Sequence, residues 1–411
     1  MTRTSSVPPA WVLALPMLSF GMTIGFVIVP LPQMLASQGV SGGRIAIAVA
    51  VMTSPAFWGF LLAPVLDVWL RRRTYALMLA VLAGVAASWV VLYHSDIMQV
   101  QAIMLIAVLA IDLFAAALGG WTGSLIEREH STRLGAWMTA YNIAGNGVGI
   151  LLAGYLTQHV AGTWAAIVWL LALLAPLLVF PLIPAPPPNT LLARESFGRF
   201  AREVAALLRR REVLVALLLF ILPSASFALT NVLGGWGESF QAAPDLVNLL
   251  GGIGTVIAGI VGCALIPMIA ARTPLRPLYL GIGLLGAIFT LCLLLAPRSP
   301  GTYGTAFIGE NIFQAAAITV STAITFEVIG PANPLAATTF ALLISTANLP
   351  IVYMEIIDGH GFDWHGVTGA FLSDAIVSGS ACLLLALVLR RWLLPPRSHG
   401  LMDASSARAP L

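Results

Sequence analysis

Long apolar runs follow one another along almost the whole chain, and few charges interrupt them. Of the 411 residues, 59% are hydrophobic, 9% are charged and none is lysine, and the mean hydropathy is +0.94. A helix that crosses a bilayer needs about 20 predominantly apolar residues. About twelve stretches fit this length, beginning near residues 11, 43, 74, 99, 133, 163, 213, 246, 275, 301, 335 and 367. The sequence therefore predicts an all-α membrane protein with about twelve transmembrane helices rather than a soluble domain.

The arginines are distributed unevenly between the two sides of the predicted bundle. When the apolar stretches are threaded back and forth, all but two of the 20 basic residues fall on one side, the exceptions being Arg44 and Arg298. Because arginine is hard to translocate, the arginine-rich side marks the cytoplasm. We expect a multi-pass protein of the bacterial inner (plasma) membrane with both termini in the cytoplasm. The pI of about 9.0 then reflects topology rather than nucleic-acid binding.

A polar stretch divides the chain near its middle. Residues 184–212 contain four prolines, three of them in the run Pro186-Pro187-Pro188, and six arginines. Proline stiffens the exit from one bundle, and the arginines keep the segment in the cytoplasm. We therefore expect a six-helix bundle in residues 1–183, a cytoplasmic linker in 184–212, and a second six-helix bundle with a short cytoplasmic tail in 213–411.

The two predicted bundles also repeat each other. The segment Gly59-Phe-Leu-Leu-Ala-Pro64 aligns without gaps on Gly262-Cys-Ala-Leu-Ile-Pro267, and Ile111-Asp-Leu-Phe aligns on Glu310-Asn-Ile-Phe. The first pair lies on the second helix of each bundle and the second pair on the fourth. Two copies in the same orientation predict bundles related by an axis along the membrane normal, with a substrate site between them near the midplane.

A cluster of charges stands at the inner end of the second predicted helix, where Asp67 is followed by Arg71, Arg72 and Arg73. Arginine stays ionised and can bind a carboxylate through two hydrogen bonds, so these residues are candidates for a cytoplasmic gate that latches neighbouring helix ends. Ala270 stands where the second half would have the acid, and any latch is therefore asymmetric. The alternative is that the arginines only set topology and Asp67 is a solvated helix end.

Two acids lie within otherwise apolar stretches, Asp112 and Glu310. A carboxylate at such depth is costly unless it is paired, protonated or facing water. An acid that is protonated there can load and release a proton during a transport cycle, so both are candidates for proton coupling. Alternatively, each is a neutral acid hydrogen-bonded to a neighbouring helix. Asp374, on the last predicted helix and nearer its outer end, is a weaker candidate.

No arginine falls inside the predicted helices away from their ends. The substrate cavity must then recognise its ligand with acids, amides, hydroxyls and aromatics, and we expect it to favour neutral, zwitterionic or cationic solutes over polyanions. The candidate cavity residues are Trp121, Tyr141, Asn142, Asn146, Asn231, Asn311, Gln314, Thr346 and Asn348.

A short outer loop is predicted between the last two helices, and it carries Asp358, His360, Asp363 and His365. Such side chains bind divalent metals, but they also populate any exposed loop, and we predict neither a metal site nor a cofactor. The three cysteines lie within apolar stretches and indicate no disulfide framework. No Gly-x-x-x-x-Gly-Lys-Ser/Thr segment is present to bind ATP, so the expected energy source is an ion gradient.

These features together resemble the major facilitator superfamily, and four segments are similar to its AmpG-like branch. The segments are Trp58–Asp67, Asp112 with the following Glu127-Arg-Glu-His, Glu310-Asn311, and Ala336–Ser345. That branch includes muropeptide permeases, acetyl-CoA transporters and the RhtX/FptX siderophore importers. The resemblance implies two six-helix bundles and a secondary transporter that is not an enzyme.

Several residues of the muropeptide permeases are replaced in this chain. Gly59 stands for a lysine, Ala116 for a second aspartate and Thr339 for a glutamine, and the basic residues that those permeases carry within helices five, seven and eleven are absent. We therefore expect proton-coupled import of a medium-sized organic solute such as a siderophore, with an anhydro-muropeptide as the alternative.

Two other classes of function are more distant alternatives. One is a membrane-embedded transferase with catalytic groups at His360 and Asp363, and the other is a sensor built on a transporter fold. The expected partners are the lipid bilayer, a small-molecule substrate and protons as the coupling ion, with no nucleic acid, and the chain is expected to be a monomer.

Overall fold

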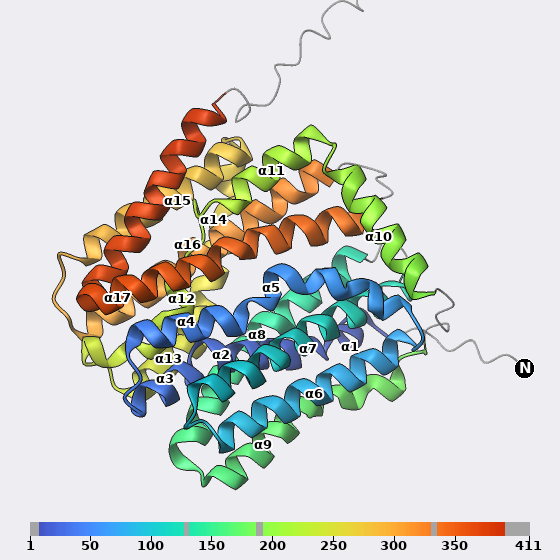
Figure 1. Ribbon diagram of the computed structural model, residues 1–411, viewed down its shortest axis with the longest axis horizontal. Coiled ribbons are helices and arrows are strands. Elements are labelled where there is room, and N and C mark those ends of the chain that lie inside the picture. The colour runs from blue at the N-terminus through green and yellow to red at the C-terminus, as the bar shows by residue number, and fades with distance from the viewer. Residues whose placement is uncertain (1–7, 127–130, 186–191, 330–334, 391–411) are drawn as a thin grey trace, which may run out of the picture.

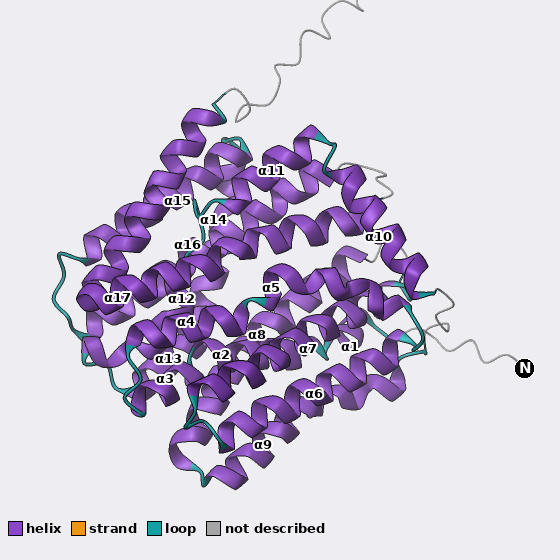
Figure 2. Ribbon diagram, viewed as in Figure 1, coloured by secondary structure: helices purple, strands orange, loops and turns teal. Residues whose placement is uncertain are grey.

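The computed structural model describes residues 8–126, 131–185, 192–329 and 335–390, and every regular element in these ranges is a helix (Figure 2). Nine helical segments of the described chain are long and apolar enough to cross a membrane. One of them, Thr338–Val388, contains two helices that turn back on each other. The long helix α8 and the interrupted segment from α11 to η5 run alongside these nine (Figure 1). The predicted all-α membrane fold is confirmed. The predicted run Pro186-Pro187-Pro188 and the segment Glu127-Arg-Glu-His lie outside the described residues.

Proline shapes the crossings of the first half. The helices are α1 (Ala10–Ala14), α2 (Met17–Ile28), α3 (Pro30–Ser37), α4 (Gly42–Thr53), α5 (Pro55–Trp58), η1 (Gly59–Asp67), α6 (Arg72–Leu92), α7 (Ile97–Gly123), α8 (Ser131–His159), α9 (Gly162–Leu174) and η3 (Ala175–Leu182). The helix breaks before α3 and α5 coincide with Pro30 and Pro55, and the two 3₁₀ segments contain Pro64 and Pro181. Proline removes an α-helical hydrogen bond, so bends and 3₁₀ turns at these points are expected.

The second half contains a helix that is interrupted within the bundle. Its elements are α10 (Ala193–Leu207), α11 (Arg211–Ile221), α12 (Leu229–Val232), η4 (Leu233–Gly235), η5 (Gly237–Phe240), α13 (Pro244–Leu249), the π-turn η6 (Leu250–Gly254), α14 (Thr255–Ala270), α15 (Leu275–Leu293), α16 (Pro300–Ile329) and α17 (Ala336–Val388). Between α11 and α12 the chain is unwound, and Phe227 adopts a left-handed conformation with φ of 50°.

The two arms of α17 are joined by a sharp turn rather than by a loop. Only His365 and Gly366 leave helical geometry, and Gly366 has a φ of 58° that favours glycine. The predicted outer loop is therefore wrong: Asp358, His360 and Asp363 all lie in the helical first arm, and Asp358 is fully buried there. Glycines on both sides of the turn let the two arms pack closely together: a Cβ on Gly369 would lie 2.0 Å from the carbonyl oxygen of Gly361.

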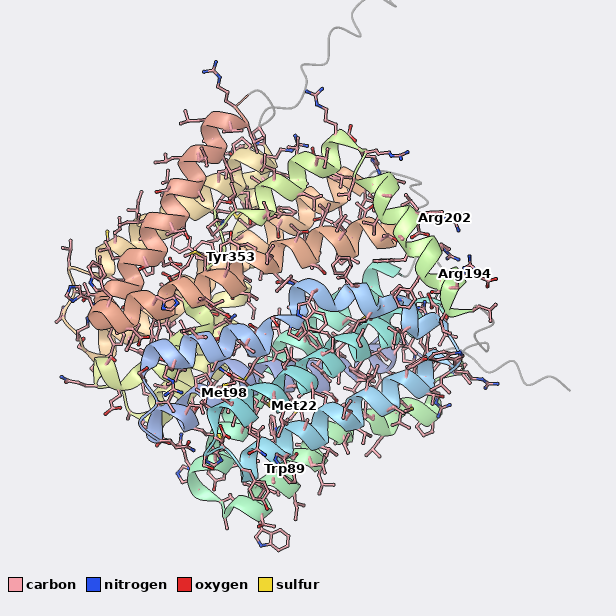
Figure 3. All side chains as sticks on the ribbon, viewed as in Figure 1. Met22, Trp89, Met98, Arg194, Arg202 and Tyr353 are labelled. Atoms are coloured by element: carbon pink, nitrogen blue, oxygen red, sulfur yellow. The ribbon has the colours of Figure 1, made fainter. Side chains whose placement is uncertain are left out.

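Helix α10 lies across one end of both halves, and we call this end the linker side and the opposite end the far side (Figure 1). The Ser196 hydroxyl of α10 donates to the carbonyl of Pro64 at 3.0 Å, and Glu203 accepts a hydrogen bond from Thr338 on α17. The exposed Arg194 and Arg202 extend from α10 away from the helices (Figure 3). The linker thus contacts both halves with one face and presents arginines on the other.

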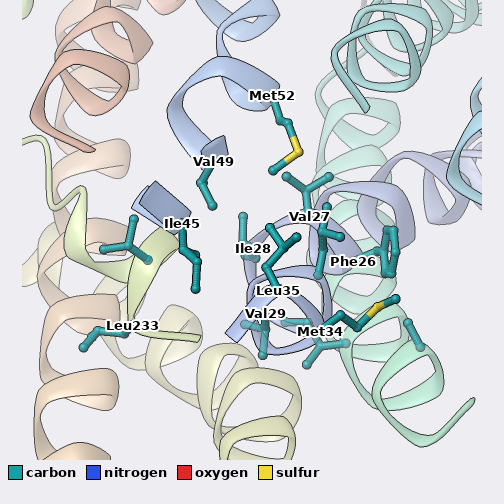
Figure 4. Close-up of a cluster of buried hydrophobic side chains, with 14 of the residues drawn as sticks. Phe26, Val27, Ile28, Val29, Met34, Leu35, Ile45, Val49, Met52 and Leu233 are labelled. Carbon is teal, nitrogen blue, oxygen red and sulfur yellow. The ribbon is translucent and has the colours of Figure 1, made fainter. Parts of the chain in front are cut away.

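The two halves are packed together on the far side. One buried apolar cluster combines Val29 and Ile45 of the first half with Leu233 of the second (Figure 4). The Trp236 indole donates to the carbonyl of Gly42 at 3.1 Å, and Gln33 donates to Asn248 at 2.9 Å. These contacts close the molecule on the far side.

Candidate functional site: a cavity between the two halves

A cavity of about 490 Å³ lies between the two halves. Both halves contribute to its wall, chiefly through α2, η1, α7 and α8 on one side and α12, α16 and α17 on the other. From Ile28 and Val352 it extends toward the linker side as far as Ala63 and Ala341. The packed far side closes its other end, so the cavity faces the linker side.

Close helix packing positions the amides of the first half. Helices α2 and α8 approach each other so tightly that a Cβ on Gly21 would lie 2.1 Å from the carbonyl oxygen of Asn142. Small residues at such a contact allow helix backbones to come together inside a membrane. The contact places Asn142 and Asn146 beside α2, where both line the cavity.

The unwound segment between α11 and α12 positions polar groups of the second half. Its free carbonyl groups need donors in an apolar environment, and Tyr353 donates to the carbonyl of Ile221 at 2.7 Å, while Thr230 donates to that of Phe227 at 2.8 Å. Tyr353 projects from α17 near the middle of the molecule (Figure 3). Thr230 and Asn231 follow the break directly and line the cavity.

Six of the nine predicted cavity residues line this cavity, and three do not. The six are Asn142, Asn146, Asn231, Asn311, Gln314 and Asn348. Trp121 is fully buried and donates to the carbonyl of Pro184, Tyr141 stacks on Trp137, and Thr346 donates to the carbonyl of Leu342 one turn earlier. The structure thus places these three outside the wall, because their helix faces point into the bundles or toward neighbouring rings.

Hydrogen bonds hold several of the lining amides in place. Asn231 donates to Glu355 at 2.7 Å, Gln314 donates to Thr230 at 2.7 Å, and Asn311 donates to the carbonyl of Phe307 at 2.8 Å. Side chains restrained in this way present a defined pattern of polar atoms to a ligand.

Asp112 is the one charged residue in the described wall of the cavity. Its buried Oδ2 atom has no hydrogen-bond partner in the structure, and neither has Oδ1 of the nearby Asn146. A ligand that supplies a donor or a positive charge would satisfy these acceptors.

Glu310, the second predicted coupling residue, lies away from the cavity. It is fully buried and accepts a hydrogen bond from Thr290 of α15 at 2.6 Å. The repeat explains the placement, because Glu310 aligns with the buried Ile111, whereas its neighbour Asn311 aligns with Asp112 and shares its position in the wall. The register of the repeat was the signal that could have separated the two acids.

Three further acids are buried, and of these only Asp374 is predicted from the sequence as a coupling candidate, below Asp112 and Glu310. Glu355 is not singled out by the sequence and Asp358 is predicted in an outer loop, whereas the two lie one turn apart on the first arm of α17, and Asp374 lies on the second arm. Glu355 stands directly behind the cavity wall, bonded to Asn231 and Thr53. Glu355 and Asp358 are three residues apart in sequence, so a helix places both on one face. The prediction of an outer loop at Asp358 excluded this helical pattern.

The predicted gate residues gather within the first half. Arg72 forms an ion pair with Asp67 and lies against Gly120 of α7, and Arg73 stands over the Trp121 ring with its guanidinium carbon 5.9 Å from the ring centre. Both members of the ion pair are about one-third exposed (31% and 34%), so the pair is worth little in stability.

The residues considered for metal binding are dispersed. His360, Asp363 and His365 are exposed at the far side, Asp363 is 3.4 Å from the Ser41 hydroxyl, and Asp358 is buried. In the part of the chain that the structure describes, no group of three or more histidine, cysteine or acidic side chains is placed to hold a metal ion.

Comparison with known proteins gives one family and a set of similar structures. A sequence model described as the Major Facilitator Superfamily matches residues 12–299. Among curated proteins, none matches the chain significantly in sequence.

Three solved structures illustrate the likeness of the fold. A POT family transporter in complex with 5-aminolevulinic acid has a TM-score of 0.72 at 12% identity, covering 93% of this chain and 96% of its own. A D-xylose-proton symporter has a TM-score of 0.67 at 16% identity, covering 92% and 96%. A bacterial homologue of the human lysosomal transporter Spinster, in an inward-facing and unoccupied conformation, has a TM-score of 0.67 at 13% identity, covering 93% and 96%.

Proposed function

Because the chain belongs to the Major Facilitator Superfamily, we propose that it is a secondary transporter that imports a medium-sized organic solute together with protons. The observation that carries this proposal is the composition of the cavity wall. The described wall contains one carboxylate, that of Asp112, six amide side chains and no basic residue. A buried anionic solute would find no fixed positive charge there, whereas a neutral, zwitterionic or cationic solute would find acceptors.

A siderophore-like chelate suits this wall better than a muropeptide does. The volume of about 490 Å³ lies within the usual range of small-molecule sites. Phe20, Phe60 and Phe307 line it and can pack against the apolar surface of such a chelate. An anhydro-muropeptide brings several carboxylates and is the alternative substrate. Both choices follow the resemblance to the AmpG-like branch, which is part of the proposal.

The proposed direction rests on the side to which the cavity opens. The arginines of α10 favour placing the linker side in the cytoplasm of a bacterial inner membrane. The closed far side would then face outward, and the structure would correspond to an inward-facing state. The likeness to an inward-facing Spinster homologue agrees with this assignment.

Proton coupling is proposed for two acids with different positions. Asp112 stands in the cavity wall, where a bound proton changes its carboxyl group from an acceptor into a group that can also donate to a solute held beside it. Glu310 is buried in the second half and would bind a proton without touching the solute. A coupled cycle needs a proton to be held in one state and released in the other, which a carboxylate without a fixed cation permits.

Uptake by a strain that lacks this gene and its paralogues tests the proposal. Expression of the chain should restore growth on an iron-loaded hydroxamate siderophore under iron limitation, and Asp112→Asn should abolish the recovery. Asp245→Asn is the matched control, because Asp245 is an exposed acid on α13 outside the cavity. Restored recovery of anhydro-muropeptides without any effect on iron uptake would refute the charge argument.

A further inference from the structure

Four buried acids converge inside the second half, behind the cavity wall. Glu310 of α16 and Glu355 and Asp358 of α17 are fully buried, and Asp374 on the second arm of α17 is 4% exposed. Asp358 is close enough to interact electrostatically with the other three. None of the four belongs to the wall of the central cavity, although Glu355 bonds to two residues that do.

Much of this cluster is left without hydrogen-bond partners. Both carboxyl oxygens of Asp358, Oε2 of Glu310 and Oδ1 of Asp374 are buried and unpartnered in the structure. None of the ion pairs in the described chain includes a member of the cluster. Several negative charges confined in this way would repel one another strongly, so the acids need bound protons or a cation.

The charged groups on the packed elements do not supply that cation. Arg44 of α4 is exposed, Arg276 of α15 pairs with Glu327 toward the linker side, and the Arg298 guanidinium donates to Thr368 at the far side. No group of three or more acids in the described residues has the arrangement of a metal site. Bound protons are the remaining way to neutralise the cluster.

The other titratable groups nearby are neutral and engaged elsewhere. Tyr303 of α16 donates to the carbonyl of Leu233, and Cys382 of α17 donates to that of Ser224. Tyr279 of α15 packs edge-on against a phenylalanine of α11. In the described structure these groups donate no hydrogen bond to the four acids. The protons that neutralise the acids must therefore come from outside the cluster.

Two threonine hydroxyls are placed so that each can hydrogen-bond to a glutamate of the cluster whether that glutamate is protonated or ionised. Thr290 Oγ1 lies 2.6 Å from Glu310 and 3.1 Å from the carbonyl oxygen of Gly286. A hydroxyl has one proton and can also accept, so when Thr290 donates to the carbonyl of Gly286 its oxygen can accept a hydrogen bond from a protonated Glu310. When Glu310 is ionised, the same hydroxyl can turn and donate to it.

The same arrangement recurs at Glu355. Thr53 Oγ1 lies 3.2 Å from Glu355 and 2.9 Å from the carbonyl oxygen of Val49, and Asn231 donates to the other oxygen of Glu355. Since Thr53 and Asn231 both line the cavity, Glu355 lies one side chain away from water that enters there.

Apolar rings separate the cluster from the far side. One turn before Glu310 stands Phe307, and one turn before Asp374 stands Phe371, each toward the far side and each almost completely buried. Phe240 joins this layer by packing against the Phe371 ring. A proton on the cluster therefore has polar neighbours toward the cavity and aromatic ones toward the far side, where the Arg298 guanidinium stacks over the rings of Phe240 and Phe371 at 5.3 and 5.6 Å.

We propose that Glu310, Asp358 and Asp374 form a proton-binding site inside the second half, and that Glu355 exchanges its protons with the central cavity. This site extends the proposed proton coupling to the last transmembrane helix and rests on that function, but the binding of protons can be tested without transport. A hydronium ion in the cavity protonates the Glu355 carboxylate and leaves water, and Glu355 then passes the proton to the Asp358 carboxylate and is itself left as a carboxylate.

Infrared spectroscopy of the purified full chain reports protonated carboxyl groups directly through their C=O stretching band. At neutral pH, Asp358→Asn and Asp374→Asn should each lose part of this band relative to the unaltered protein, because each removes one protonated acid. Asp245→Asn, which removes an exposed acid, should leave the band unchanged. Equal bands in all four proteins would show that the cluster is ionised and would overturn the proposal.

The role of Glu355 is tested by raising the pH rapidly and recording how the same C=O band decays with time. In Glu355→Gln the remaining acids should deprotonate at least about tenfold more slowly, which corresponds to about 1.4 kcal/mol of added barrier. Unchanged rates would remove Glu355 from the path.

If neither a siderophore nor a muropeptide is transported, the proposed function fails while these two spectroscopic results still decide whether the site exists. Each of these variants exchanges a carboxyl for an amide of similar size, and a gel-filtration profile identical to that of the unaltered protein confirms the fold.

Discussion

Gly359 offers a direct way to perturb the balance between the two sides of the transporter. It lies on the first arm of α17 against α4, where an added Cβ would be 2.8 Å from the carbonyl oxygen of Gly43 and 3.1 Å from the Ala46 Cβ. A backbone oxygen cannot move aside as a flexible side chain can. In Gly359→Ala the far-side interface must therefore loosen, and a state in which this interface is open would not meet the clash.

The magnitude follows from the difference between the two states. Alanine favours the helix over glycine by about 1 kcal/mol, but this gain applies equally to both states and cancels. Overpacking of a tight contact costs about 1 to 3 kcal/mol, and it applies only to the state closed on the far side. The equilibrium should shift toward the state that is open on the far side by a factor of roughly 5 to 150.

Spin-label distances measure this shift in a background whose three native cysteines are replaced by serine. Labels at Ser95 and Trp364 report on the far side, and labels at Arg133 and Ala271 report on the linker side, since all four positions are exposed. The far-side distance should lengthen and the linker-side distance shorten in Gly359→Ala. Gly281→Ala is the matched control, because its Cβ would meet no atom within 4 Å. Unchanged distance distributions in Gly359→Ala would refute the idea that this interface opens.

Three further predictions concern topology, coupling and stability. A cysteine at the exposed Gly198 of α10 should resist a membrane-impermeant thiol reagent in intact cells and react after permeabilisation, and labelling in intact cells would overturn the orientation. Glu310→Gln and Asp112→Asn should each reduce gradient-driven siderophore uptake while exchange of bound for free solute persists in at least one of them; full accumulation in both would assign the acids to structure. Tyr353→Phe removes the donor to the Ile221 carbonyl and should lower the free energy of unfolding by about 1 to 3 kcal/mol, measured as a fall in Tm, whereas an unchanged Tm would show that the unwound segment does not depend on this bond.

The all-α membrane class could be predicted because it depends on local properties. Whether a stretch can span a bilayer is decided by its own length and apolarity, and the helices expected near residues 74, 99 and 275 coincide with α6, α7 and α15. The amides at Asn142, Asn146 and Asn311 could be singled out for the same reason, since a polar side chain deep in an apolar helix must face a cavity or another polar group.

The interruption between α11 and α12 could not be read from composition. The stretch that begins at Val213 is predominantly apolar, yet Phe227 is left-handed and the chain is unwound there. The break is stabilised by contacts from distant residues, including the approach of Gly283, where a Cβ would collide with the Ser224 carbonyl oxygen. Pro223 is a local signal of a break, because proline removes a helical hydrogen bond and leaves Leu222 before it extended, but the left-handed turn at Phe227 depends on the neighbouring helix.

What the sequence by itself determined is which residues lie at membrane depth, and what the tertiary structure decided is where each of them faces. Asp112 and Glu310 look equivalent as acids in apolar helices, but one lines the cavity and the other is buried against Thr290. Asp358 and Asp374 come together because the two arms of α17 turn back at Gly366. The physical reason is that burial in a membrane is set by hydropathy along one helix, whereas the neighbours of a side chain are set by the rotation and crossing of helices that are far apart in the chain.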